Sequence, residues 1–266
     1  MTVVDKEQDE MSRPTTTYEQ LADLGAEEPT LIEGLPGHGL VASIAVDLLN
    51  DQLDLSHCGN IASEAFPPVA TFDDGLVQDL VRVYGCGEPS VMTLQSDLTI
   101  PEQAYEPLSQ CVIEDIATEL ERAIFIAAAP ASSEEQLGSV TGIATTEGIR
   151  EELEAADIQL ADERGVVGGV TGALVRQCYQ DGVPAALLVV RAHPQLPDPR
   201  AAKAVVENAL EPLVDFQVDT GPLDEQAEEI QQRMQQVASQ FQQAQRAAGE
   251  GGDDGGFRSE GSGMYQ

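Results

Sequence analysis

Apolar positions along the middle of the chain change repeatedly between helical spacing and short continuous runs. Residues 40–53 place apolar side chains at steps of three and four, which predicts an amphipathic helix. Residues 123–129 are apolar throughout, which is typical of a strand buried on both faces of a parallel sheet. The two kinds of segment alternate without an internal repeat, so the chain is expected to mix helices and strands.

The same patterns extend over most of the chain. They predict further strands at residues 31–33, 81–83, 91–94, 166–170 and 185–190. They predict further helices at residues 108–122, 148–156, 173–180 and 199–213, with Asp198 as the N-cap of the last one. This order indicates an α/β fold with a mostly parallel central sheet flanked by helices.

A different pattern occupies residues 222–248. Apolar or small residues recur there at alternating steps of four and three, which predicts a C-terminal heptad helix. Its larger seam residues are Leu223, Ile230, Met234, Val237 and Phe241. The seam either packs on its own domain or pairs with a helix from another subunit. Because the stripe is narrow and its flanks are rich in Gln and Glu, we favour an intersubunit or helical-hairpin contact.

Composition divides the chain into four parts. Residues 1–28 are acidic and polar and are expected to form a flexible arm without a secretory signal. The α/β domain occupies residues 29–221, and the heptad helix follows at 222–248. Residues 249–266 are rich in glycine and are expected to form a disordered tail.

Charge restricts what the protein can bind. Asp and Glu number 47 against 13 Lys and Arg, so the net charge is −34. This field repels polyanions, which excludes direct binding to nucleic acid or to an anionic membrane surface. Lys6 and Lys203 are the only lysines, and an acidic, lysine-poor chain indicates a halophilic protein whose repulsion is screened by salt. No apolar run approaches 18 residues, so no transmembrane helix is expected.

The cysteines and histidines are scattered along the chain. Cys58, Cys86, Cys111 and Cys178 form no CxxC pair, so we expect no metal site. We interpret them as reduced, mostly buried residues of a cytoplasmic protein.

Two glycine-rich turns each connect a predicted strand to a predicted helix. They contain Gly34, Pro36, Gly37 and Gly39 in the first turn, and Gly168, Gly169, Thr171 and Gly172 in the second. Backbone amides at such turns can hold an anion, but the spacing matches neither a dinucleotide fingerprint nor a P-loop. The turns are either structural, with Thr171 capping its helix, or they line a ligand site. No carboxylate pair or activated nucleophile stands out, so we assign no catalytic residue and no cofactor.

The chain ends in a hydrophobic residue, a tyrosine and a residue with a free carboxylate. Met264, Tyr265 and Gln266 follow the glycine-rich stretch. An apolar anchor, an aromatic ring with a hydroxyl group and a terminal charge are features of a docking tag. The tether favours this interpretation over an inert end, because a tether is useful only if its end binds something.

Three segments together resemble the proteasome assembly chaperone family. They are residues 31–41 (LIEGLPGHGLV), 168–174 (GGVTGAL) and 197–202 (PDPRAA), and the similarity extends over about residues 30–235. The resemblance implies an α/β fold shaped like that of nucleoside phosphorylases, a C-terminal helical extension and homo-oligomers. His38 departs from the family pattern, where a small or aliphatic residue is frequent.

The resemblance also implies a function. Members of this type are non-enzymatic partners of the 20S proteasome, and some archaeal relatives insert a C-terminal hydrophobic–Tyr–any motif between subunits of the α-ring. That motif corresponds to Met264, Tyr265 and Gln266 here. Assembly, activation and adaptor roles stay open. The alternative is a small-molecule or nucleotide-binding enzyme, ATP-grasp-like or phosphorylase-like, that uses the glycine turns.

Overall fold

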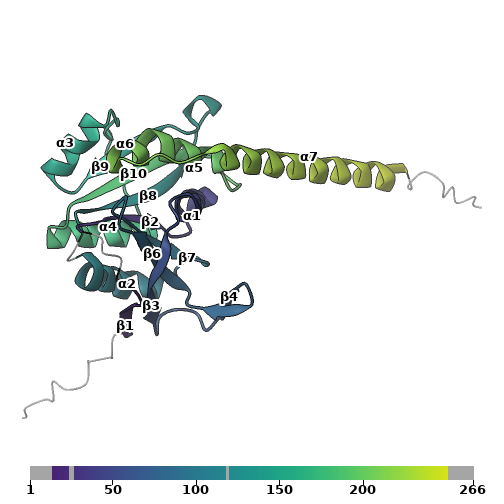
Figure 1. Ribbon diagram of the computed structural model, residues 1–266. Coiled ribbons are helices and arrows are strands. Elements are labelled where there is room, and N and C mark those ends of the chain that lie inside the picture. Colours follow the sequence, from purple (N-terminus) through teal and green to yellow (C-terminus); the bar gives the residue numbers. More distant parts are fainter. Residues whose placement is uncertain (1–13, 24–26, 118–119, 251–266) are drawn as a thin grey trace, which may run out of the picture. The chain divides into compact units, whose positions relative to one another are not determined.

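An eight-stranded mixed sheet carries the fold (Figure 1). The computed structural model describes residues 14–23, 27–117 and 120–250, with the backbone alone at 238 and 241–250. The chain divides into two units, Met1–Asp224 and Glu225–Gln266. All strands and all helices except most of α7 belong to the first unit.

The strands and helices have the following bounds. The strands are β1 (Thr16–Gln20), β2 (Thr30–Gly34), β3 (Ser56–Ser63), β4 (Thr71–Asp73), β5 (Leu76–Gln78), β6 (Val81–Cys86), β7 (Val91–Ser96), β8 (Arg122–Pro130), β9 (Val140–Ala144) and β10 (Ala185–Ala192). The α-helices are α1 (Val41–Gln52), α2 (Tyr105–Cys111), α3 (Glu147–Ala155), α4 (Gly169–Asp181), α5 (Pro199–Val205), α6 (Glu211–Val214) and α7 (Gly221–Glu250). Short helical turns are η1 (His38–Leu40), η2 (Glu102–Ala104), η3 (Val112–Ile116), η5 (Glu134–Gln136) and η6 (Val206–Leu210).

The strand order is β1-β3-β6-β7-β2-β8-β10-β9, and only its centre is parallel. β7, β2, β8 and β10 run parallel to their neighbours in that group. The outer pairs β1–β3, β3–β6, β6–β7 and β10–β9 are antiparallel. Only β6 and β7 are joined by a short connection that returns the chain directly. The α/β prediction is therefore confirmed as a mixed sheet, and the expectation of a mostly parallel sheet is wrong outside the centre.

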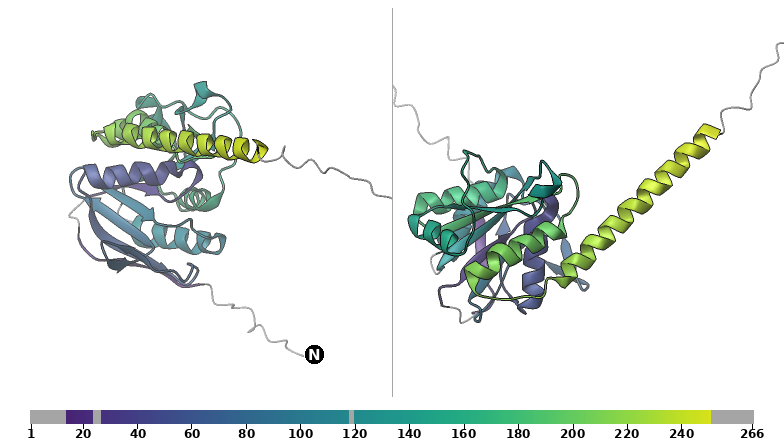
Figure 2. Two further views of the ribbon diagram at one scale, coloured as in Figure 1. Left: turned by 90° about the vertical axis from the view of Figure 1, so that its right-hand side faces the viewer. Right: turned by 90° about the horizontal axis from the view of Figure 1, so that it is seen from above.

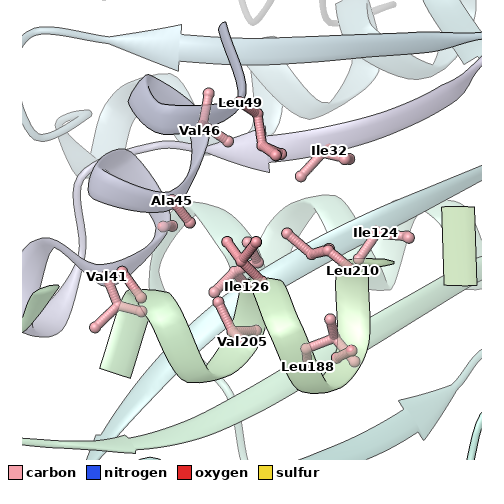
Figure 3. Packing of buried hydrophobic residues seen from close by; sticks show 14 of the residues in the cluster. Ile32, Val41, Ala45, Val46, Leu49, Ile124, Ile126, Leu188, Val205 and Leu210 are labelled. Atoms are coloured by element: carbon pink, nitrogen blue, oxygen red, sulfur yellow. The ribbon is translucent and has the colours of Figure 1, made fainter. Parts of the chain in front are cut away.

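Helices cover both faces of the sheet (Figure 2). On one face, α1, α3 and α5 pack against strand residues such as Ile32, Ile124 and Leu188, and Figure 3 shows part of this cluster. On the other face, α2 and α4 pack against residues such as Leu31 and Phe125. Alternate residues of β2 and β8 thus enter opposite cores, which confirms that the apolar run at 123–129 is a strand buried on both faces.

Three local predictions are wrong in whole or in part. The helix expected at 108–122 does not extend to Arg122, because that residue already begins β8. The segment 166–170 is not a strand: Val166 is 96% exposed and α4 already begins at Gly169. Glycines at 165, 168 and 169 weaken strand pairing and favour a turn there. The expected arm at 1–28 contains β1, which pairs antiparallel with β3 at the edge of the sheet. Pairing with β3 therefore makes residues 16–20 a strand, although their own composition does not predict one.

Gly34 is required by a close approach of α1 to β2. A Cβ atom at this position would lie 2.5 Å from Cβ of Val46, which is branched and fully buried. A Cβ atom at Gly37 would meet nothing within 4 Å, although both glycines belong to the same turn.

We predict that Gly34→Ala lowers the free energy of unfolding by about 1–3 kcal/mol, because it overpacks the β2–α1 contact. Denaturant unfolding followed by circular dichroism measures the change. Gly37→Ala is the matched control and is expected to stay within about 0.5 kcal/mol of the parent. Equal stabilities for the two variants would contradict the packing argument.

Candidate functional site

A buried carboxyl group lies where the two glycine turns meet. Glu33, the penultimate residue of β2, has no exposed surface. Its Oε1 accepts a hydrogen bond from the backbone N–H of Leu35 (3.1 Å), and its Oε2 accepts one from the N–H of Ile126 (3.4 Å). The Thr171 hydroxyl donates to the same group, 3.3 Å from each carboxyl oxygen. Glu33 therefore links β2, β8 and α4.

Burial dominates the ionisation of this group. Removal from water raises the pKa of Glu33 to about 8, against the lowering effect of hydrogen bonds from Ile126, Leu35 and Thr171. The carboxyl group is thus mostly protonated at neutral pH, unlike the exposed acids that give the chain its charge. Among the many acids of the chain, the one sequence signal for Glu33 is its place inside an otherwise apolar strand, directly before a glycine.

The third segment of the family resemblance reaches the same region. The backbone N–H of Asp198 donates to the carbonyl oxygen of Gly39 at 2.9 Å. The Asp198 side chain accepts from the N–H groups of Ala201 (3.0 Å) and His193 (2.7 Å), so it is the predicted N-cap of α5. All three resembling segments therefore meet at the carboxyl ends of the parallel strands.

A cavity of about 430 Å³ lies at this edge of the sheet. In open α/β sheets, ligands bind beyond the carboxyl ends of the strands, where neighbouring connections leave on opposite faces. That is the case here, since α1 follows β2 on one face and α2 follows β7 on the other. The lining includes the first turn (Pro36, Gly37 and His38), the second turn (166–171), part of β8 and the side chains of Thr99, Ile100 and Tyr105.

The cavity lining is mainly apolar and carries no Asp, Glu, Lys or Arg among the described residues. Its side-chain polar groups belong to His38, Thr99, Tyr105 and Thr171. The His38 Nε2 atom is buried and has no hydrogen-bond partner within the described part of the chain. The arrangement can accept a small, largely apolar ligand with a few polar groups, and it offers no fixed positive charge to hold a phosphate chain.

The predicted turn residues divide into two groups. Gly34, Gly39 and Gly172 serve the backbone: Gly39 has φ +64°, and a Cβ atom at Gly172 would lie 2.3 Å from the Val167 carbonyl oxygen. The cavity is lined by the remaining ones, Pro36, Gly37, Gly168, Gly169 and Thr171. Thr171 does not cap α4, as one interpretation of the sequence held, because it lies inside that helix and binds Glu33.

The predicted helix contacts are described only in part. Leu223 is buried in the core of the first unit. Farther along α7, Met234 and Val237 are 45% and 61% exposed, and Ile230 is partly exposed. The side chain of Phe241 and the tail residues Met264, Tyr265 and Gln266 lie outside the described residues.

The remaining predictions concern cysteines, metals and membranes. Cys58, Cys111 and Cys178 are buried, Cys86 is partly exposed, and all four are free thiols as expected. Among the described residues, no group of His, Cys, Asp and Glu has the arrangement of a metal site. Within the same residues, no helix is long and apolar enough to cross a membrane.

Comparison with known proteins identifies the family. The model of the PAC2 family matches residues 31–238, so the chain belongs to this family and the resemblance to proteasome assembly chaperones is confirmed. The uncharacterized protein MJ0106 of Methanocaldococcus jannaschii is 27% identical over 224 residues, which are 84% of this chain and 91% of that protein. MJ1210 of the same organism is 26% identical over 219 residues, 79% and 83% of the two chains.

Solved structures agree with the family assignment. PbaA of Pyrococcus furiosus, an archaeal homolog of proteasome-assembly chaperone, superposes with a TM-score of 0.77 at 25% identity over 88% of this chain and 97% of its own. PbaB of the same organism, an archaeal proteasome activator, has a TM-score of 0.73 at 21% identity over 84% and 99% of the two chains. The second likeness shows the fold alone.

We predict that Glu33 makes stability fall with rising pH. Its folded-state pKa of about 8 lies above the ordinary value of 4.5, so between these values the native state binds more protons than the unfolded state. The free energy of unfolding contributed by this group therefore falls between about pH 4.5 and 8. Denaturant titrations across this range on the parent and Glu33→Gln isolate its part, because the other acids are common to both. In Glu33→Gln, the free energy of unfolding is expected to fall less between pH 4.5 and 8 than in the parent. Identical pH profiles for the two proteins would contradict a raised pKa of Glu33.

Proposed function

We propose that the protein is a non-enzymatic, homo-oligomeric partner of the 20S proteasome that docks on the α-ring through its C-terminal tail. Membership of the PAC2 family over residues 31–238 carries this proposal. Two structures of similar fold support it, since one is described as a homolog of proteasome-assembly chaperone and the other as a proteasome activator. The protein would act in the cytoplasm as an assembly chaperone, activator or adaptor.

The tail supplies the docking chemistry. Met264 would fill an apolar site between α-subunits, and Tyr265 would stack there while its hydroxyl group donates a hydrogen bond. The terminal carboxylate of Gln266 would pair with a basic pocket residue of the proteasome. The glycine-rich stretch before these residues would let each tail reach its site independently of the folded unit.

Oligomerisation would strengthen a contact that is weak for one tail. Several tails on one particle raise the overall affinity by about 10²-fold or more when their spacing fits the ring. Met234 and Val237 provide exposed apolar positions on α7 for pairing with another subunit. Paired helices would cover this seam and leave the polar faces in water.

A small-molecule site is the second candidate function, and the cavity beside both glycine turns favours it. The cavity of about 430 Å³ is within the range of ligand pockets. An enzyme acting on nucleotides would need charge complementarity for phosphates, and the described lining offers no Lys or Arg. A ligand that tunes the docking protein is therefore a simpler use of this cavity than nucleotide chemistry.

We predict that deletion of residues 264–266 abolishes proteasome binding and leaves the fold intact. Tyr265→Ala is expected to weaken binding at least about tenfold, because it removes both the ring and the hydroxyl group. The measurement is a pull-down with purified archaeal 20S proteasome in molar KCl, with peptide hydrolysis as a second readout. Phe257→Ala, which removes another aromatic ring of the tail, is the control and should bind as the parent does.

The two readouts separate the roles. Tail-dependent binding with faster hydrolysis would establish an activator, and tail-dependent binding at an unchanged rate would favour assembly or adaptor work. Full binding by the truncated protein would refute docking through the tail.

We predict that Met234→Glu combined with Val237→Glu lowers the oligomeric mass, because it places charges in the apolar seam of α7. Light scattering after size exclusion measures this mass in molar KCl. Gln232→Glu with Gln235→Glu is the control, since it adds the same charge at exposed positions beside the seam. An equally lowered oligomeric mass in both double variants would mean that added charge, and not the apolar seam, governs assembly.

A further inference from the structure

The few basic side chains of this acidic chain fall into two groups. The structure describes nine of them, and five form ion pairs: Arg82, Arg122, Arg150, Lys203 and Arg233. Within the described residues the other four form none: Arg164, Arg176, Arg191 and Arg200. In a chain with 47 acids, an arginine without a carboxylate partner needs a separate explanation.

Three of these four arginines line one open groove. Arg164 precedes α4, Arg176 lies on α4, and Arg191 lies near the end of β10. The groove runs over the part of β9 and β10 beside α4 and has a volume of about 1210 Å³. It is separate from the buried carboxyl of Glu33, which is not part of its lining.

Charge along the groove differs from that of the whole chain. Its lining contains four arginines, with Arg150 as the fourth, and three acids, Glu147, Asp162 and Glu163. Their sum is +1 (4 − 3), whereas the chain as a whole carries −34. Arg150 is already paired with Glu147 and Glu154, so Arg164, Arg176 and Arg191 provide the available positive charge.

Exposed apolar side chains line the same groove as these charges. Val166 is 96% exposed and Tyr179 is 69% exposed, and both line the groove. Ile143 on β9 and Val189 on β10 belong to the lining too. Large apolar side chains left in water beside unpaired arginines are typical of a surface that binds another chain.

The groove chemistry selects among occupants. A face-to-face contact with a second copy would set arginine against arginine, since a two-fold interface uses the same patch on both subunits. Nucleic acid carries a charge on every phosphate, more than three arginines can pair, and the excess is repelled by the net charge of the whole chain. A short peptide can place its few carboxylates on the arginines themselves. Arginines on three separate elements match carboxylates spaced along an extended chain better than one compact anion.

We propose that this groove binds an extended acidic peptide segment of a partner protein, with carboxylates on Arg164, Arg176 and Arg191 and apolar side chains beside Val166 and Tyr179. The interaction does not depend on the C-terminal tail or on the proteasome contact. It gives the folded unit a recognition surface of its own.

Fluorescence anisotropy tests the proposal with the full chain, at a KCl concentration where circular dichroism shows complete folding. The probe is a fluorescein-labelled peptide, GEFDGEGEFDGE, and its counterpart has Gln for Glu and Asn for Asp. The acidic peptide is expected to bind at least about tenfold more tightly than the neutral one, because only carboxylates form charge-assisted pairs with arginine.

Variants assign the binding to the groove. The triple variant Arg164→Gln, Arg176→Gln and Arg191→Gln is expected to weaken the acidic peptide at least about tenfold. Arg200→Gln is the matched control, because it removes an exposed, unpaired arginine outside the groove, and it should leave affinity unchanged. Within the described residues, the side chains of the three substituted arginines make only long hydrogen bonds: Arg176 Nε to Gln180 Oε1 at 3.5 Å and Arg191 Nη1 to the Pro130 carbonyl oxygen at 3.4 Å. The triple variant is therefore expected to fold.

Four results would overturn the proposal. The first is equal affinity for both peptides or for the parent and triple variant. The second is competition by inorganic phosphate at the concentration of the peptide, which would indicate a compact anion site. The third is a lower oligomeric mass of the triple variant, which would make the groove a subunit interface. The fourth is tighter peptide binding after deletion of residues 251–266, which would make the chain's own tail the occupant.

Discussion

The Glu33 carboxyl group is the constraint on which the arrangement at the carboxyl edge of the sheet depends. A carboxyl group without exposed surface is costly, because water no longer solvates it. Donors from Leu35, Ile126 and Thr171 compensate part of this cost, and each belongs to a different segment. Any shift of one segment would leave a buried polar group without its partner, so the first turn, β8 and α4 are held in one geometry.

Sheet order makes this convergence possible. β2 lies between β7 and β8, and all three strands end at the same edge because they are parallel. The chain therefore brings residues 138 positions apart, Glu33 and Thr171, into direct contact. Two glycines allow the close contacts that this arrangement needs. The absence of a side chain at Gly34 leaves room for the Val46 side chain, and its absence at Gly172 leaves room for the Val167 carbonyl group.

The sequence predicted those parts of the fold that rest on local pattern. The run at 123–129 is a buried strand, and residues 40–53 and 222–248 lie within or beside α1 and α7. The pattern misses β1, β3 and β9 in the main sheet, because their order comes from pairing with distant strands and not from their own composition. The segment 166–170 was assigned as a strand on its valines, but its glycines allow the turn that starts α4.

The candidate site was predictable in its turns and not in its chemistry. Glycine spacing indicates both turns, but the only local signal for the burial of Glu33 is its place in an otherwise apolar strand before a glycine. Only the fold shows that Glu33 is enclosed and that Arg164, Arg176 and Arg191 share a groove. The spacing of these arginines in sequence is irregular, because they lie on a loop, a helix and a strand.

Placement of charge connects the fold to recognition. The chain has 13 basic residues against 47 acids, so most basic side chains have a carboxylate nearby. Five of the nine described basic side chains form an ion pair. Arginines without such a partner can still form ion pairs with another molecule, and the exposed apolar side chains beside them can pack against it. Such a groove can discriminate among acidic partners in concentrated salt, because screening removes the long-range repulsion between two acidic chains but leaves paired contacts at short distance. Direct hydrogen-bonded pairs, and not the overall field, are therefore the basis on which a chain of this charge can select its partners.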